Sequence, residues 1–133
     1  MNSAEYPSSK TLVYSQKSIE RAERSLICSP FNLSLFTAMR QQSVPLGAIA
    51  QDKGVKQGYT KYPLSELVCD NALSWLIQVG VLRREVDGQG ITDSFRLTPL
   101  GYQLVEQLSH NWRQPTWRDR TENFLTRWLR LPF

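Results

Sequence analysis

Residues 63–101 constrain the fold of this chain more than any other stretch. They read PLSELVCDNALSWLIQVGVLRREVDGQGITDSFRLTPLG, and three patterns follow one another there without a linker. Apolar residues at three- and four-residue spacing predict a buried helix over Pro63–Val79. Alternating side chains and a glycine-rich turn predict a β-hairpin over residues 81–97. Thr98 and Pro99 are typical of a helix cap and a first helical turn, so another helix follows the hairpin.

The residues before this stretch predict mainly short helices. Apolar side chains share one face after Ser15 or Ser18, either of which can cap a helix with its hydroxyl. Ser29 and Pro30 predict the start of a second helix, because serine suits the cap and proline suits the first turn. The remaining elements are expected to be an extended segment at 44–46, a short helix at 46–51 and a loop at 53–62.

The run from residue 77 to residue 101 resembles the wing and following helix of bacterial winged-helix domains. The matching positions are Ile77, Gly80, Val81, Leu82 and Arg83 before the hairpin, and Leu97, Thr98, Pro99, Leu100 and Gly101 after it. The resemblance implies an α+β, mostly helical winged-helix domain. The residue patterns outside the match add an extra N-terminal helix and a C-terminal amphipathic helix to it. Winged helices occur in transcription regulators, in the dimerisation domains of some methyltransferases and in modules that bind only protein.

Length and composition suit one domain with additional segments at its ends. The chain has 133 residues, of which 41% are hydrophobic. No apolar run is long enough to span a membrane, and the N-terminus lacks the pattern of a signal peptide, so a cytoplasmic protein is expected. We expect a flexible lead at 1–14, the winged-helix domain with its added helix at 15–110, and a basic amphipathic helix in 111–133.

No catalytic, metal or cofactor site is predicted. Cys28 and Cys69 lie far apart in apolar surroundings, which favours free, buried thiols over a disulfide or a metal site. The single histidine, His110, has no partner at a spacing typical of a catalytic group. The chain is therefore expected not to be an enzyme.

The resemblance suggests an interface for duplex DNA, with the helix at 63–79 in the major groove and the hairpin on phosphates. That helix has no Lys or Arg, and its two carboxylates give residues 63–82 a formal charge of −2. Contact mainly through backbone phosphates is therefore expected, and simple solvation of these polar side chains is the alternative. The candidate nucleic-acid-binding residues are Lys53, Lys56, Tyr59, Lys61, Asn71, Gln78, Arg83, Arg84 and Arg96.

The C-terminal segment carries most of the basic excess. Residues 111–133 hold five Arg against one Asp and one Glu, or +3 of the net charge of +4. Thr116 and Asp119 are spaced as in a capping box at the start of a helix. The candidate partner-binding residues on its apolar face are Trp117, Phe124, Leu125, Trp128 and Leu131. This face can cover the chain's own core, pair with the first helix or a second copy, dock a partner, or lie on a membrane surface.

Two functional hypotheses follow. The leading one is a small DNA-binding protein of the transcription-regulator type, dimeric through its terminal helices. The alternative is a non-enzymatic protein–protein interaction module on a winged-helix scaffold, whose C-terminal helix docks a partner or a membrane surface. The acidic character of the 63–79 helix motivates the alternative, because a helix that reads DNA is usually basic.

Overall fold

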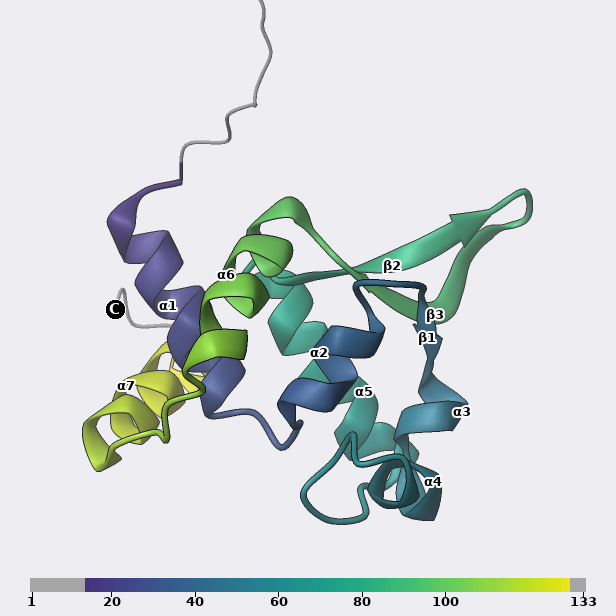
Figure 1. Ribbon diagram of the computed structural model, residues 1–133, viewed down its shortest axis with the longest axis horizontal. Coiled ribbons are helices and arrows are strands. Elements are labelled where there is room, and N and C mark those ends of the chain that lie inside the picture. The colour runs from purple at the N-terminus through teal and green to yellow at the C-terminus, as the bar shows by residue number, and fades with distance from the viewer. Residues whose placement is uncertain (1–13, 130–133) are drawn as a thin grey trace, which may run out of the picture.

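The computed structural model describes residues 14–129, and the fold is α+β and mostly helical (Figure 1). Most of the expected N-terminal lead, residues 1–13, and the candidate Leu131 lie outside this range. The elements are α1 (Gln16–Ile27), α2 (Leu33–Ala38), β1 (Val44–Pro45), α3 (Leu46–Ile49), α4 (Gln51–Lys56), α5 (Glu66–Gln78), β2 (Leu82–Asp87), β3 (Gly90–Leu97), α6 (Pro99–His110) and α7 (Trp117–Trp128).

The three strands form a small antiparallel sheet in the order β1-β3-β2. Val44 of β1 lies opposite Phe95, and Leu82 of β2 lies opposite Leu97. The register shifts between Arg84 and Val86, and beyond this point the hairpin extends away from the helices into solvent (Figure 1). Only the base of the hairpin therefore contributes to the core.

The core lies between the helices and the base of the hairpin. Its largest fully buried side chains include Phe31, Phe36 and Phe95, together with Leu73 of α5 and Leu104 of α6. Phe31 and Phe36 meet edge to face with ring centroids 6.3 Å apart, which is a favoured arrangement for aromatic pairs. The alternating and helical apolar patterns of the sequence thus converge on one cluster.

The predicted hydroxyl caps are confirmed at three helix starts. The Ser15 side chain accepts a hydrogen bond from the Ser18 backbone N–H, and Thr98 accepts one from the Gly101 N–H. At the start of α7, Thr116 and Asp119 form a complete capping box. Each cap satisfies a backbone donor that has no partner within its own helix.

Three predicted boundaries are wrong. The second helix begins at Leu33 rather than at Ser29–Pro30, because Phe31 is extended and forms a bridge with Thr60. Part of the expected 53–62 loop is helical, since α4 runs over Gln51–Lys56. The helix predicted from Pro63 begins at Glu66, because Ser65 is its cap and accepts from the Val68 N–H.

Gly54 allows α4 to lie against the preceding turn. A Cβ atom at this position would fall 1.8 Å from the carbonyl oxygen of Ile49. The glycine that suggested a loop is therefore required by a close approach of two backbone segments. No helix within residues 14–129 is long and apolar enough to cross a membrane.

Candidate interaction surface

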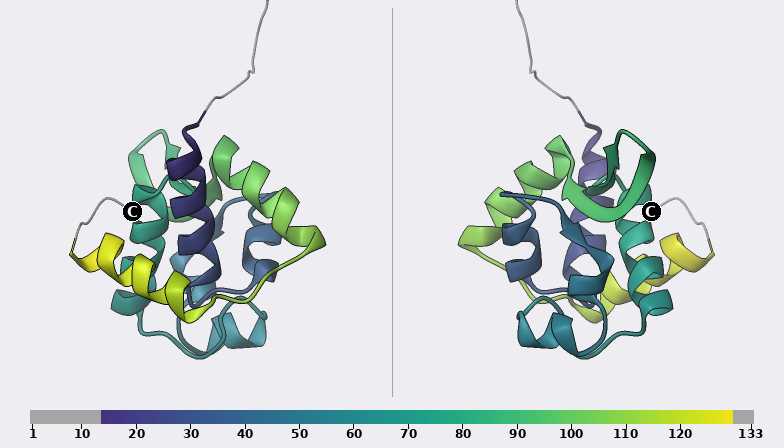
Figure 2. Two further views of the ribbon diagram at one scale, coloured as in Figure 1. Left: turned by 90° about the vertical axis from the view of Figure 1, so that its left-hand side faces the viewer. Right: turned by 90° about the vertical axis from the view of Figure 1, so that its right-hand side faces the viewer.

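The C-terminal helix α7 contacts the rest of the chain through its polar side. It lies across the C-terminal half of α1 (Figure 2). Arg24 of α1, which is buried, donates from Nη2 to Oγ1 of Thr126 at 3.4 Å, and its Nη1 lies 3.7 Å from Oε1 of Glu122. Thr126 is buried as well. An arginine and polar side chains of α7 therefore occupy an interface that apolar side chains usually fill.

Arg113 fixes the start of α7 against α1. Its Nε donates to Oε2 of Glu23 at 2.8 Å, and its Nη1 donates to Oδ2 of Asp119 at 2.7 Å. Asp119 also accepts from the backbone N–H of Thr116 at 2.9 Å. The hydrogen bond from Arg113, with those from Thr116, lowers the pKa of Asp119 to about 2. The carboxylate is thus held charged between a cation and a helix N-terminus.

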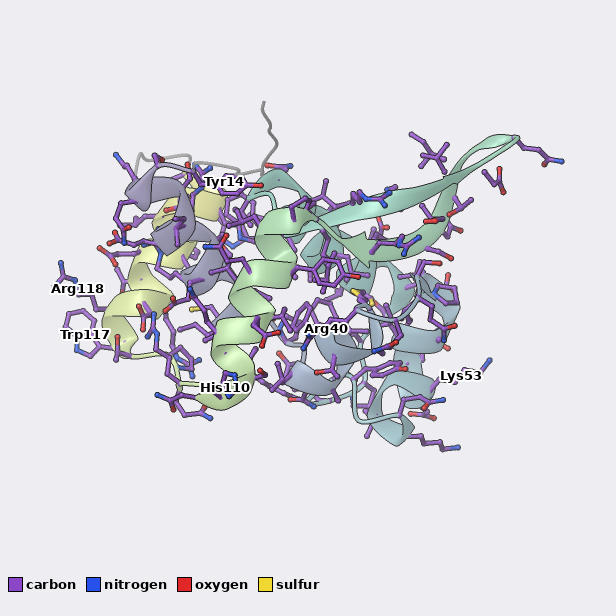
Figure 3. The ribbon with its side chains drawn as sticks, turned by 45° about the horizontal axis from the view of Figure 1, so that its top comes forward. Tyr14, Arg40, Lys53, His110, Trp117 and Arg118 are labelled. Atoms are coloured by element: carbon purple, nitrogen blue, oxygen red, sulfur yellow. The ribbon has the colours of Figure 1, made fainter. Side chains whose placement is uncertain are left out.

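The apolar face of α7 points away from the chain. Trp117, Phe124 and Trp128 are 78%, 54% and 58% exposed, and Leu125 is half-buried. Trp117 and its neighbour Arg118 project from the end of the molecule into solvent (Figure 3). We call Trp117, Phe124 and Trp128 the aromatic stripe. The helix pairs with the first helix, as one interpretation expected, but it does so through its polar face and leaves the aromatic stripe exposed.

A groove of about 520 Å³ lies between α5 and α7. Leu64, Val68 and Ala72 line its α5 side. Trp128 belongs both to this groove and to the aromatic stripe, so the two surfaces are continuous. Tyr62 also lines this hollow. We refer to it as the α5–α7 groove.

Three cations line the α5–α7 groove: Lys61, Arg120 and Arg127. Burial lowers the pKa of Lys61, and the positive charge of Arg120 lowers it further. Burial also lowers the pKa of Arg127, whose guanidinium lies over the Trp128 ring at 4.5 Å from the ring centroid. No Asp or Glu is among the described residues that line the groove, so its charge is positive.

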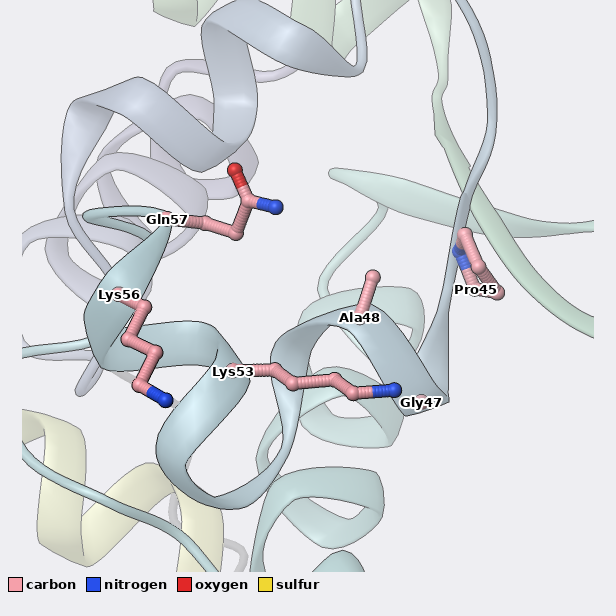
Figure 4. Close-up of a pocket in the computed structure, with 6 residues that line it drawn as sticks. All are labelled: Pro45, Gly47, Ala48, Lys53, Lys56 and Gln57. Atoms are coloured by element: carbon pink, nitrogen blue, oxygen red, sulfur yellow. The ribbon is translucent and has the colours of Figure 1, made fainter.

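The structure separates the predicted nucleic-acid residues into several groups. Lys53 and Lys56 of α4 are exposed and line a hollow beside α3, with Pro45 and Ala48 on its other side (Figure 4). Tyr59 is half-buried and packs against the core. These two lysines are therefore available to a ligand, whereas Tyr59 mainly stabilises the fold through its packing against the core.

The candidates on and next to α5 lie beside α7. Lys61 donates from Nζ to the carbonyl oxygen of Ser29 at 3.1 Å. Asn71 lines the α5–α7 groove, and both Asn71 and Gln78 line an adjoining hollow with Arg127 and Trp128. The face of α5 that would enter a major groove is thus flanked by another helix of the same chain.

Two of the three hairpin arginines are engaged within the chain. Arg84 donates to Oδ1 of Asp70 at 3.1 Å and lies over the Phe95 ring. Arg96 donates to both carboxylate oxygens of Glu85 at 3.2 Å. Arg83 is exposed and points to the other side of the strand from Arg84. All three arginines lie at the base of the hairpin. Arg84 also donates to Oγ of Ser74 at 3.5 Å, and Ser74 lines the hollow that contains Arg127 of α7.

A family model described as Npun_F0494-like matches residues 12–127. The chain belongs to this family. No curated protein and no solved structure matches the chain. The family match extends over α1 and nearly all of α7, so it includes the pair of terminal helices as well as the helix–hairpin–helix region.

Sequence reasoning missed Arg120 and Arg127 as site residues. Their spacing of seven residues, two helical turns, was the available signal, because it places both side chains on the same edge of α7. It could not indicate that this edge faces Lys61 and α5. That proximity arises only when α7 lies across α1.

The described residues contain no group of three or more His, Cys, Asp or Glu side chains that could hold a metal ion. Both cysteines are free: Cys69 is buried, whereas Cys28 is half-buried and lines the α5–α7 groove. His110 is exposed and lies 3.8 Å from Glu106 on the same helix.

Proposed function

We propose that this chain is a non-enzymatic interaction module that binds a partner protein on a winged-helix scaffold. One observation carries the proposal: α7 packs on α1 through polar side chains and turns Trp117, Phe124 and Trp128 outward. Large aromatic side chains left in water raise the free energy of the isolated chain, and covering them drives association. Trp is also among the residues that most often contribute strongly to binding at protein interfaces.

The order of elements supports the winged-helix scaffold. A minimal strand β1 precedes the short helices α3 and α4, α5 leads directly into the β2–β3 hairpin, and α6 follows it. The strand order β1-β3-β2 places the first strand beside the second strand of the hairpin. The minimal first strand and the helix–hairpin–helix order support the proposed scaffold, with α1 and α7 added at the ends.

The surface of α5 favours a protein partner over DNA. Leu67 is 70% exposed and Val68 is also exposed, whereas Glu66 adds a negative charge in the first turn. Arg84, which could have neutralised phosphates, is paired with Asp70 of this helix. An apolar and acidic helix surface suits contact with a protein and repels a phosphate backbone.

The proposal is tested by affinity capture of the tagged chain from its native host, followed by reconstitution with each purified candidate partner. A double variant, Trp117→Ser with Phe124→Ser, should lose a partner that the unaltered chain retains. Both side chains are exposed, so the variant should keep its unfolding free energy within about 1 kcal/mol. Leu104→Ala, which truncates a buried residue, should instead cost roughly 2–5 kcal/mol.

Other results would overturn this proposal. Equal capture by the double variant and the unaltered chain would show that the aromatic stripe is not the contact surface. Sedimentation with vesicles, or self-association that the double variant abolishes, would assign the stripe to a membrane or to a second copy. Analytical ultracentrifugation and vesicle sedimentation distinguish these outcomes.

A second candidate function is contact with the backbone of duplex DNA. It is favoured by Lys53, Lys56 and Arg83, which are exposed on α4 and β2. None of the three lies on α7, so a chain that binds a partner through the aromatic stripe leaves these exposed side chains for phosphates. The salt dependence of binding tests this function, as set out below.

A further inference from the structure

We propose that the α5–α7 groove binds an acidic amphipathic segment of the partner protein, with its apolar side chains on Leu64, Val68 and Ala72 and its carboxylates on Lys61, Arg120 and Arg127. This inference rests on the proposed function and names the chemistry of the partner. One groove combines an apolar surface with a cationic border, and none of its described lining residues is a carboxylate. This combination supports the inference.

Lys61 and Arg120 retain hydrogen-bonding capacity for an occupant. Lys61 uses one donor on the Ser29 carbonyl, and an ammonium group carries three. Arg120 is exposed, and its positive charge adds to burial, the main cause, in lowering the pKa of Lys61. A carboxylate placed between them would relieve the repulsion between the two positive charges and form charge-assisted hydrogen bonds.

The apolar lining determines which kind of anion fits. Val68 is half exposed and supplies most of the accessible aliphatic surface on the α5 side, while the buried Leu64 and Ala72 form the floor of the groove beside it. This surface can accept the side chains of Leu, Ile or Val from an amphipathic helix or an extended segment. Tyr62 and Trp128 lie at the groove as further apolar contacts.

Three other occupants fit less well. A nucleic-acid strand would find stacking faces in Tyr62 and Trp128, but it carries no aliphatic side chains to cover the apolar α5 side of the groove. A bilayer surface is flat and cannot follow a groove. A second copy of this chain carries the same net charge of +4, which opposes its association with a cationic groove. Charge complementarity therefore favours an acidic segment of another protein.

The experiment uses the full chain and a fluorescein-labelled synthetic peptide of about 12 residues, or three helical turns, with Leu on one face and Glu on the other. Fluorescence anisotropy at low salt should show saturable binding. Arg120→Glu should raise the Kd roughly tenfold, because it replaces an attraction by a repulsion at an exposed rim. Val68→Glu should have at least as large an effect, because it adds a charge to the apolar lining.

Arg118→Glu is the matched control. It makes the same change of charge on the same helix, but Arg118 is exposed, pairs with Glu122 and does not line the groove. Its Kd should stay within about twofold of the unaltered chain. Circular dichroism and urea unfolding of each variant verify that the fold is intact.

Several outcomes would overturn the inference. They are absence of peptide binding, equal loss in Arg118→Glu and Arg120→Glu, and Arg120-dependent binding of an oligothymidylate or of anionic vesicles in place of the peptide. If the peptide fails to bind while capture of a partner still depends on Trp117 and Phe124, the proposed function stands and only the acidic class of partner is wrong. If both fail, the proposed function falls as well.

Discussion

At the scale of single residues, close backbone approaches decide where a side chain can be tolerated. Gly101 lies in the first turn of α6, where that helix crosses the base of the hairpin. A Cβ atom there would fall 2.2 Å from the carbonyl oxygen of Val81. The same carbonyl accepts a hydrogen bond from the backbone N–H of Thr98 at 3.0 Å, so it cannot move without loss of that contact.

We therefore expect Gly101→Ala to destabilise the fold by roughly 1–3 kcal/mol, although alanine favours helices in general. The measurement is urea unfolding followed by circular dichroism. Gly88→Ala at the hairpin tip is the control, because a Cβ atom there meets nothing within 4 Å. Equal stability of the two variants would mean that the α6–hairpin contact adjusts without cost.

At the scale of elements, α7 is an amphipathic helix that packs on the chain with its polar face and exposes its apolar face. Its attachment depends on a few charged groups rather than on a large apolar contact. Arg113 connects Glu23 of α1 with Asp119 of α7, and Arg24 reaches Glu122 and Thr126. Buried charged pairs contribute less net stability than apolar contacts of equal size, but they fix orientation. This attachment leaves the aromatic stripe free to bind.

The pH dependence of stability tests the attachment. The folded-state pKa of Asp119, about 2, lies below its ordinary value of 3.8. Its charged form therefore stabilises the fold fully above pH 3.8, and this contribution is lost as the pH falls toward 2. We expect Asp119→Asn to cost roughly 1–3 kcal/mol at pH 7, because charge-assisted hydrogen bonds are weakened.

The unfolding free energy of both chains is measured by urea unfolding at a series of acidic pH values. The difference in unfolding free energy between the unaltered chain and Asp119→Asn should narrow as the pH falls below about 4. Asp93→Asn on the exposed side of β3 provides a control. A constant difference down to pH 2 would contradict the role assigned to the charged Asp119 carboxylate, which pH 2 would half protonate.

Local signals in the sequence predicted the positions of most elements, whereas boundaries that depend on non-local contacts were missed. Hydroxyl caps and alternation depend on residues near one another in the chain, and they located α1, the hairpin, α6 and α7. The start of α2 was misplaced because Phe31 pairs with Thr60. The α4 helix was missed because its glycine serves a backbone contact that no local pattern reveals.

At the scale of the whole molecule, the available positive charge is distributed over separate elements. Lys53 and Lys56 lie on α4, Arg83 lies at the base of the hairpin, and the groove cations lie on and beside α7 (Figure 1). The sequence predicted the charge of the tail, but it could not predict that Arg84 and Arg96 would be neutralised by Asp70 and Glu85. The sequence therefore predicted which segments are rich in basic residues. It could not predict which of these residues are left unpaired, because pairing depends on tertiary contacts.

Duplex DNA should consequently bind weakly and mainly through phosphates. Three available cations predict a plot of log K against log salt with a slope of about −3, since each phosphate contact contributes roughly −0.9. Arg83→Ala should reduce the slope by about one. The measurement is a titration of labelled duplex over a range of salt concentrations starting at roughly 50 mM.

Arg96→Ala is the matched control for DNA binding, because Arg96 lies on the neighbouring strand and is paired with Glu85. It should leave the slope unchanged. An equal effect of Arg83→Ala and Arg96→Ala would contradict the division between available and neutralised arginines. No measurable binding at the lowest salt concentration would exclude the second candidate function.

The position of Cys28 gives the chain a built-in chemical reporter. Its free thiol lines the α5–α7 groove, whereas Cys69 is buried and its pKa is raised to about 12. Only the thiolate reacts with alkylating reagents, and burial also raises the pKa of Cys28, so labelling is best done at mildly alkaline pH. Cys28 should then react in the folded chain and become protected when the groove is filled. Cys69 should react only on unfolding, so mass spectrometry of one labelled sample reports occupancy and folding together.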